Sequence, residues 1–217
     1  MYQGNEKLYN YDGADIIITH VLNLCKVDSA IDVGCCLGVF SKVLKQKGVR
    51  RVKSLDQGNT NKDILGKHID LQDFVEFDLN AGVYHDKDRY DLAVCLEVAE
   101  HIDPKNEMNV VETLVGLSDV ILFSAAIPGQ GGDGHLNEQW PSYWRRLFGY
   151  FGYKFIDVVR PFIWDNDIVY KWYRQNTFLV AKTDIANQIW NKYNMLDIEN
   201  NMIDVVHPLY YTGNKKK

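Results

Sequence analysis

The segment EVAEH, residues 97–101, combines two carboxylates with an imidazole, side chains that can hold a divalent cation or move a proton. Glu97, Glu100 and His101 stand at positions i, i+3 and i+4, a spacing that predicts one shared helix face. Such a set suits Mg²⁺ or Mn²⁺. Because the segment offers no fourth ligand of its own, we favour a metal-free interpretation in which Glu100 and His101 are candidates for proton transfer.

A second polar segment, GQGGDGHLNEQWPSYW, occupies residues 129–144. Its glycines together with Asp133, His135, Asn137 and Glu138 predict a mobile polar loop, a kind of segment that often carries functional residues. His135 is the first candidate for a general base that takes the proton of a hydroxyl, and it is the candidate fourth ligand if a metal binds. The alternative is that His135 caps the following helix or lies in solvent.

Polar residues also stand at the ends of four predicted strands, and ligands of open parallel sheets bind outside the carboxyl ends of strands. A carboxylate such as Asp56 can accept from two vicinal ribose hydroxyls, and Asp78 can accept from an adenine amino group, so these ends predict an adenosine cofactor. The alternative for each acid is to cap the next helix. The positions are Asp32, Gly34, Cys35, Cys36 and Gly38 at the first strand, Asp56 and Gln57 at the second, Asp78 and Leu79 at the third, and Leu96 and Glu97 at the fourth.

The turn GCCLGVFS, residues 34–41, differs from the dinucleotide-binding fingerprint because it lacks G-x-G-x-x-G, so pyrophosphate binding has little support. Its glycines let the backbone approach a ligand closely. The chain has four cysteines, and their positions show neither C-x-x-C nor zinc-finger spacing. We therefore expect free thiols, with Cys35 and Cys36 as small residues that line the ligand pocket.

These positions depend on a regular alternation of strands and helices. Apolar strands that alternate with helices predict an α/β fold with a doubly wound, mostly parallel sheet of seven strands and helices on both faces. No helix-length pattern separates the last two strands, so they are expected to pair antiparallel. Strands are predicted at 29–33, 51–56, 74–78, 90–97, 119–125, 153–160 and 173–182, and helices at 14–26, 38–48, 106–117, 141–152 and 184–193.

The length, charge and hydropathy of the chain indicate its domain organisation, its partners and its location. We expect the 217 residues to form one domain, with an N-terminal segment at 1–13 and a C-terminal tail at 194–217 that packs on it. A net charge of −5 disfavours nucleic acid as a partner, and the basic run at 215–217 is expected to be a solvated tail. No apolar run is long enough to span a membrane and no signal peptide is recognisable, so a cytoplasmic protein is expected.

Together these motifs resemble those of class I S-adenosylmethionine-dependent methyltransferases. Asp32, Gly34 and Gly38 match the family's acidic residue and G-x-G-x-G turn, with Cys36 where the middle glycine usually stands. Asp56 matches the ribose-binding acid, Asp78 the residue near adenine, and YDLAVCLEVAEHI the fourth-strand motif. The resemblance covers residues 14–182 and implies a Rossmann-like sheet, an antiparallel last strand and S-adenosylmethionine as cofactor.

Two shorter resemblances concern the chemistry. EVAEH is similar to the E-x-x-E-H of metal-dependent O-methyltransferases, including those of ubiquinone synthesis and of small-RNA 2′-hydroxyls, in which the three side chains hold a divalent ion. Metal-free relatives keep a similar E-H pair, with the first glutamate facing the cofactor. The loop around His135 resembles the H-x-N-E-Q stretch of bacterial small-molecule and sugar methyltransferases.

Aromatic residues near these motifs are expected mainly to pack. Arg174 is expected to pair with a surface acid rather than to recognise an acidic acceptor. The aromatic candidates are Tyr9 and Tyr11 over the cofactor, Trp140, Tyr143 and Trp144 in an acceptor pocket, and Trp164, Trp172 and Tyr173 just before or at the start of the last strand.

The sequence therefore predicts an S-adenosylmethionine-dependent enzyme that methylates a hydroxyl of a small molecule or sugar. A divalent metal is possible but not favoured, and membrane binding and nucleic acid are not expected. The alternatives are N-methylation of a small amine, 2′-O-methylation of an RNA end, and a non-catalytic adenosine-binding scaffold. Neither the acceptor nor the oligomeric state follows from the sequence.

Overall fold

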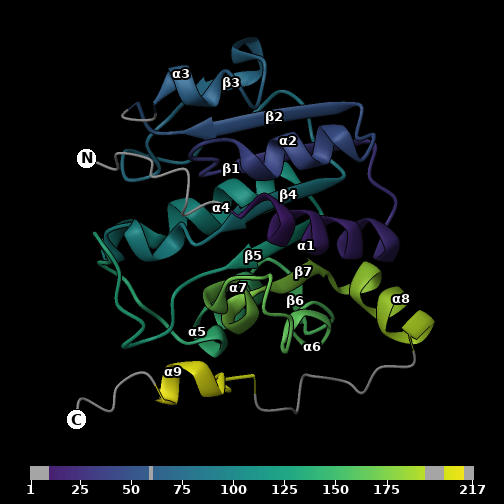
Figure 1. Cartoon of the computed structure of the whole chain (residues 1–217), viewed down its shortest axis with the longest axis vertical. Coiled ribbons are helices and arrows are strands. Elements are labelled where there is room, and N and C mark those ends of the chain that lie inside the picture. Colours follow the sequence, from purple (N-terminus) through teal and green to yellow (C-terminus); the bar gives the residue numbers. More distant parts are fainter. Residues whose placement is uncertain (1–9, 59–60, 194–202, 213–217) are drawn as a thin grey trace.

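The chain folds around a sheet of seven strands (Figure 1), seen in a computed structural model that describes residues 10–58, 61–193 and 203–212. The strands are β1 (Ser29–Val33), β2 (Arg51–Asp56), β3 (Phe74–Glu76), β4 (Leu92–Leu96), β5 (Val120–Ser124), β6 (Tyr153–Ile156) and β7 (Phe178–Lys182). Their order in the sheet is β3-β2-β1-β4-β5-β7-β6. The neighbours from β3 to β5 pair in parallel, whereas β7 runs antiparallel to β5 and β6. The predicted doubly wound sheet with an antiparallel last strand is confirmed.

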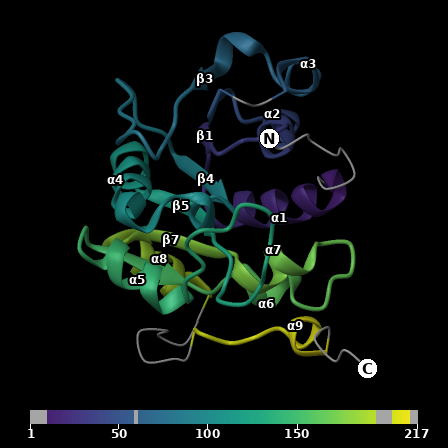
Figure 2. The ribbon, with the colours of Figure 1, turned by 90° about the vertical axis from the view of Figure 1, so that its left-hand side faces the viewer.

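Helices cover both faces of the sheet (Figure 2). They are α1 (Tyr11–Leu24), α2 (Val39–Gln46), α3 (Lys62–Leu65), α4 (Glu107–Leu117), α5 (Pro141–Gly149), α6 (Arg160–Ile163), α7 (Lys171–Asn176), α8 (Thr183–Tyr193) and α9 (Pro208–Thr212). One core cluster joins α1, α2 and α8 to one face, and a second joins α4 and α5 to the other. Neighbouring residues of β1 alternate between them, because successive side chains of a strand point to opposite faces: Ala30 lies in the first cluster and Ile31 in the second.

Local sequence explains most of these boundaries. All five residues of β4 and all five of β5 are buried, as expected for continuous apolar strands covered on both faces. Asn10 begins α1 by accepting from the Gly13 amide, so this helix starts three residues earlier than its apolar pattern predicts. Pro141 stands in the first turn of α5, where a missing N–H costs no helical hydrogen bond.

The segment between the last two strands differs from the prediction. It contains the short helices α6 and α7, and residues 173–176, predicted as strand, belong to α7. Gln175 and Asn176 are buried there because their amides bond to distant parts of the chain, which overrides their local pattern. The antiparallel pairing of β6 and β7 is nevertheless as predicted.

Residues 203–212 lie across α6 and α7 as a C-terminal strap (Figure 2). Gln175 donates to the Val205 carbonyl at 2.6 Å and accepts from the His207 amide. His207 Nε2 lies 2.8 Å from the Trp164 carbonyl, and Ile203 is buried in the core. The described part of the predicted tail therefore packs on the domain, while Tyr9 and the lysines at 215–217 lie outside the described residues.

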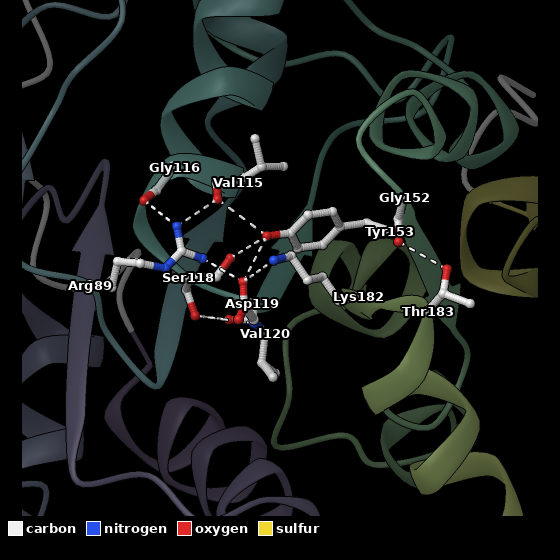
Figure 3. Close-up of polar contacts among 10 residues, drawn as sticks. All are labelled: Arg89, Val115, Gly116, Ser118, Asp119, Val120, Gly152, Tyr153, Lys182 and Thr183. Carbon is white, nitrogen blue, oxygen red and sulfur yellow. Dashed lines mark hydrogen bonds and ion pairs between the residues drawn. The ribbon is translucent and has the colours of Figure 1, made fainter.

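A polar network lies around Asp119, just before β5 (Figure 3). This end of the sheet is opposite to the carboxyl ends of β1 and β4. Asp119 pairs with Arg89 and with Lys182, whose Nζ lies 3.1 Å away. Arg89 also donates to the Gly116 carbonyl at 2.6 Å, at the end of α4, and the Tyr153 hydroxyl donates to the Ser118 carbonyl at 2.8 Å. These bonds tie α4, β5, β6 and β7 together. Among the helices of the described residues, none is long and apolar enough to cross a membrane.

Candidate active site

A cavity of about 680 Å³ opens at the carboxyl ends of β1, β2 and β4. The neighbouring strands β1 and β4 continue into connections that run to opposite sides, which is the usual ligand position in such sheets. The lining comes from the β1 turn, the ends of β2 and β4, residues 77–80, the 3₁₀ turn Ala99–His101, loop residues 130–135 and α7. All eleven predicted cofactor positions except Gly38 line this cavity.

The turn after β1 has the backbone that its glycines predict. Gly34 and Gly38 have φ angles of 77° and 76°, and a Cβ on Gly34 would lie 2.3 Å from a Val98 methyl. Cys36, at the position of the usual middle glycine, also has a positive φ of 45°. Its amide donates to Asp56 Oδ2 at 2.6 Å. Cys36 therefore adopts the left-handed backbone that a glycine would take without strain.

The acids at the ends of β2 and β3 are oriented by backbone amides. Asp56 accepts from Cys36 through Oδ2 and from the Gln57 amide through Oδ1, at 2.7 Å. Asp78 accepts from the Asn80 amide at 2.8 Å and lies beside Leu79 on the same wall. The structure thus brings Asp56 and Asp78 to one cavity, as the strand-end argument predicts.

Asp32 has a different environment, because its carboxylate is buried at the start of α2. Its Oδ2 accepts from both the amide and the hydroxyl of Ser41, at 3.1 and 2.7 Å, and the Ser41 hydroxyl bonds to Ser54 at 2.7 Å. Burial raises the pKa of Asp32 to about 7, although the two bonds from Ser41 oppose the rise. These contacts match the alternative that a strand-end acid caps the next helix.

The predicted shared helix face of EVAEH is wrong. Glu97 follows β4 with a φ of 56°, and only the 3₁₀ turn Ala99–His101 is helical. The Glu97 carboxylate accepts from Gln130 Nε2 at 2.9 Å and from Asn176 Nδ2 at 3.0 Å. Asn176 also donates to Gln130 Oε1 at 2.9 Å, so the three side chains form a closed ring. Glu100 lies beside this ring, close enough for the charge of Glu97 to act on its carboxyl group.

A smaller cluster joins Glu100 and His101 to His135, and their possible ligand atoms lie within 4.8 Å of one another. Glu100 is fully buried, and no lysine or arginine pairs with its carboxylate among the described residues. Burial and the charge of Glu97 raise the pKa of Glu100, and burial lowers the pKa of His101. One carboxylate and two imidazoles could hold a transition ion such as Mn²⁺ or Zn²⁺ more readily than Mg²⁺.

Glu138 organises the loop that carries His135. It accepts from the Gly129 and Gly131 amides at 2.7 and 2.8 Å and from His135 Nδ1 at 2.8 Å. Partial burial would raise the pKa of Glu138, but these bonds outweigh it and hold the pKa below its usual value. The His135 side chain is only 12% exposed, so it neither lies in solvent nor caps α5. Gly132 packs under the ring, since a Cβ there would lie 2.2 Å from Nε2.

Other candidates are placed less directly. Trp144 is buried in the core beside Phe123, and Tyr143 bonds to Glu107. Arg174 pairs with Asp167 as expected. The aromatic candidates that line the cavity are instead Trp172 and Tyr173, which α7 brings there, and Gln130 was not singled out by the sequence at all. Of the remaining aromatic candidates, Tyr11, Trp140 and Trp164 are absent from the lining.

Known proteins share the fold and, over part of the chain, a family model. Residues 31–115 match the model of a family described as a methyltransferase domain, whereas no curated protein matches the chain significantly. Among solved structures, the chain is similar to an S-adenosylmethionine-dependent methyltransferase from Clostridium acetobutylicum ATCC 824, with a TM-score of 0.63 and 12% identity over 83% of this chain and 96% of that one.

Two further solved structures resemble it. One is magnesium protoporphyrin IX methyltransferase from Synechocystis PCC 6803 with bound S-adenosylmethionine, with a TM-score of 0.57 and 18% identity over 80% of this chain and 79% of that one. The other is the methyltransferase domain of bacterial CtHen1-C, with a TM-score of 0.56 and 19% identity over 80% of this chain and 99% of that one. At these identities the likeness concerns the fold. The family match therefore shows a methyltransferase domain over residues 31–115, and the solved structures show that the chain has the fold of S-adenosylmethionine-dependent methyltransferases.

Proposed function

We propose that the chain methylates a hydroxyl group of a small-molecule or sugar-like acceptor. The observation that carries this proposal is the pair of His135 and Glu138, in which a carboxylate 2.8 Å from Nδ1 orients an imidazole at the cavity wall. Such a pair is the arrangement of a general base and its orienting partner. A hydroxyl acceptor needs this help because it is a weak nucleophile until its proton is removed.

The same proposal assigns the cofactor to the β1–β2 side of the cavity. Asp56 would hold the ribose hydroxyls, and Asp78 and Leu79 would lie beside the adenine. The turn residues Gly34 and Cys36 would face the ribose and the methionine chain. The partly exposed Glu97, with its two amide donors, would stand where the cofactor side meets the acceptor side.

The chain's residues would align the acceptor, exclude water and take a proton. When bound, S-adenosylmethionine supplies a methyl group on a positively charged sulfur. The cavity residues would hold the acceptor oxygen in line with this methyl group, so that the new oxygen–carbon bond would form as the carbon–sulfur bond breaks and its electron pair stays on sulfur as a thioether. The hydroxyl proton goes to His135, and Glu138 stabilises the resulting imidazolium.

N-methylation has less support from the cavity's charges. A free amine attacks only in its neutral form, and nearby carboxylates favour its protonated form. Glu97 and Glu100 are both in the lining. A methylated RNA end also has less support, because the lining contributed by the described residues has no lysine or arginine to meet phosphates.

Methyl transfer from radiolabelled S-adenosylmethionine to a pool of hydroxyl compounds tests the proposal. His135→Ala should lower kcat about 10²–10⁴-fold and leave S-adenosylhomocysteine affinity nearly unchanged. An undiminished kcat would remove His135 from the role of base. Cofactor binding without transfer to any acceptor would favour the non-catalytic scaffold.

The cluster of Glu100, His101 and His135 favours a second candidate, a metal-assisted version of the same transfer. An ion there would lower the pKa of the acceptor hydroxyl, and His135 would then be a ligand with Glu138 behind it. Turnover that survives EDTA would support the metal-free form. Turnover abolished by EDTA and restored by Mn²⁺ would establish the metal-assisted form.

A further inference from the structure

Among the described residues that line the cavity, carboxylates are present without lysine or arginine. The nearby Arg174 does not line it and is paired with Asp167. The acidic lining residues are Asp32, Asp56, Asp78, Glu97, Glu100 and Asp133.

Three of these acids lie on the β1–β2 side and are held by other groups of the chain. Asp32 is bonded to Ser41, while Asp56 and Asp78 are oriented by backbone amides. The other three, Glu97, Glu100 and Asp133, come from the end of β4, the 3₁₀ turn and the glycine loop. The acids of the acceptor side are therefore additional to those proposed for the adenosine.

Two of these acids lack a lysine or arginine partner. The Glu97 carboxylate is partly exposed and accepts from the neutral amides of Gln130 and Asn176, whereas the Glu100 side chain is fully buried beside Glu97. Burying a carboxylate without a counter-charge is unfavourable, so a positive ligand would bind here with a gain. S-adenosylmethionine carries a sulfonium, an ammonium and a carboxylate of its own, so its net charge is only +1. This charge is smaller than the total that the six acidic lining residues can carry.

Two aromatic side chains of α7 line the cavity, and Tyr173 lies near both Glu97 and the β1 turn. They are Trp172 and Tyr173, whose ring centroids lie 6.1 Å apart. Burial and then the charge of Glu97 raise the pKa of Tyr173, which places this ring near that carboxylate. Aromatic faces together with carboxylates are the usual surroundings of a bound ammonium group.

We infer that the acceptor carries a positively charged amino group beside the hydroxyl that is methylated, as an amino alcohol or an amino sugar does. Glu97, Glu100 and the rings of α7 hold the ammonium, which the carboxylates keep protonated and therefore unreactive. His135 serves the hydroxyl. This inference rests on the proposed function and adds the charge class of its substrate.

Two cofactor analogues can measure whether the cavity near Glu97 and Glu100 prefers a positively charged ligand. This measurement does not require the acceptor to be known. S-Adenosylhomocysteine is neutral at sulfur, whereas sinefungin carries an amine where the methyl group stands. Calorimetry on the full chain in EDTA should show sinefungin binding about tenfold or more tighter, which corresponds to about 1.4 kcal/mol. Glu100→Gln should remove most of this preference. Asp133→Asn, at an exposed loop position, should reduce it even if the Glu100 variant does not fold.

Glu112→Gln, on the exposed side of α4, is the matched control and should keep the full preference. Equal affinity for the two analogues would overturn the inference and leave the methyltransferase proposal intact, whereas failure of both to bind would reject the cofactor site itself. A sinefungin preference that disappears on adding Mn²⁺ would show that the favoured cation is a metal, which also overturns it.

Transfer assays then separate the acceptor classes. In EDTA, label should pass to a pool of amino alcohols and amino sugars and not to a pool of hydroxy acids and sugar phosphates. Label in the second pool would overturn the inference. The binding comparison decides the charge preference even when neither pool contains the natural acceptor.

Discussion

At the scale of single residues, Cys36 shows how a side chain can occupy a position shaped for glycine. Its φ of 45° lies in the left-handed region, where an L-residue other than glycine is strained by roughly 1–2 kcal/mol. We expect the free energy of unfolding of Cys36→Gly to exceed that of Cys36→Ala, which keeps the strain, by about 1 kcal/mol. Urea unfolding measures both values. Cys36→Ala should bind S-adenosylhomocysteine nearly as well as wild type. An alanine variant as stable as the glycine variant would contradict this account.

Asp56 is the residue whose removal should affect the cofactor most directly. Its carboxylate is held by the amides of Cys36 and Gln57 and, in our proposal, accepts from the ribose. Charge-assisted hydrogen bonds contribute about 1.5–3 kcal/mol, so Asp56→Ala should weaken S-adenosylmethionine binding about tenfold or more. Calorimetry measures the affinity, and circular dichroism checks that the variant is folded. Unchanged affinity in a folded variant would remove Asp56 from the site.

At the scale of elements, the glycine loop depends on Glu138. This carboxylate accepts three bonds, from Gly129, Gly131 and His135, and a glutamine has only one oxygen to replace them. Glu138→Gln should therefore lower kcat about 10–100-fold while S-adenosylhomocysteine affinity stays near that of wild type. The matched control is Glu112→Gln, an exposed position away from the loop. A wild-type kcat in the Glu138 variant would mean that the loop keeps His135 in place without it.

Asp32, which links β1 to α2 through Ser41, should make the free energy of unfolding depend on pH. The unfolded chain releases the Asp32 proton near pH 3.8, whereas the folded chain holds it to about pH 7. The free energy of unfolding contributed by Asp32 therefore falls as pH rises between these values, by up to ~4 kcal/mol. Asp32→Asn keeps an oxygen for Ser41 and has no proton to lose.

Urea unfolding of the apo forms at pH 4 and pH 8 tests this. The stability of Asp32→Asn relative to wild type should increase from the lower to the higher pH. The other titrating groups contribute equally to both proteins, so they drop out of the difference between the two free energies of unfolding. An equal difference at both pH values would show that the Asp32 carboxyl ionises as readily when folded as when unfolded.

At the scale of the whole molecule, the C-terminal strap connects to the helix that lines the acceptor side. Gln175 bonds to both the Val205 carbonyl and the His207 amide, and its neighbours on α7 include Trp172 and Tyr173. Gln175→Ala leaves these backbone groups unpaired and should lower the free energy of unfolding by roughly 1–3 kcal/mol. Gln188→Ala, on the exposed side of α8, should change it by less than about 0.5 kcal/mol. Equal effects of the two variants would mean that the strap does not stabilise the domain.

The sequence alone determined the α/β architecture and the location of the cavity. Strand and helix periods are local, so β1 and β2 were predicted with their observed bounds. The carboxyl ends of parallel strands meet at one edge, which is why Asp56 and Asp78 were predicted beside each other without any knowledge of the connecting segments.

Only the tertiary structure decided how the acceptor side is built, because its contacts join residues far apart in the chain. Spacing predicted Glu97 on a face with Glu100 and His101, but its left-handed backbone directs it to Gln130 and to Asn176, 79 residues away. Residues 173–176 of α7 were predicted as strand because their local pattern carries no sign of the Glu97 and strap contacts that bury Gln175 and Asn176. No local rule encodes such long-range hydrogen bonds, and they set which side chains line this part of the cavity.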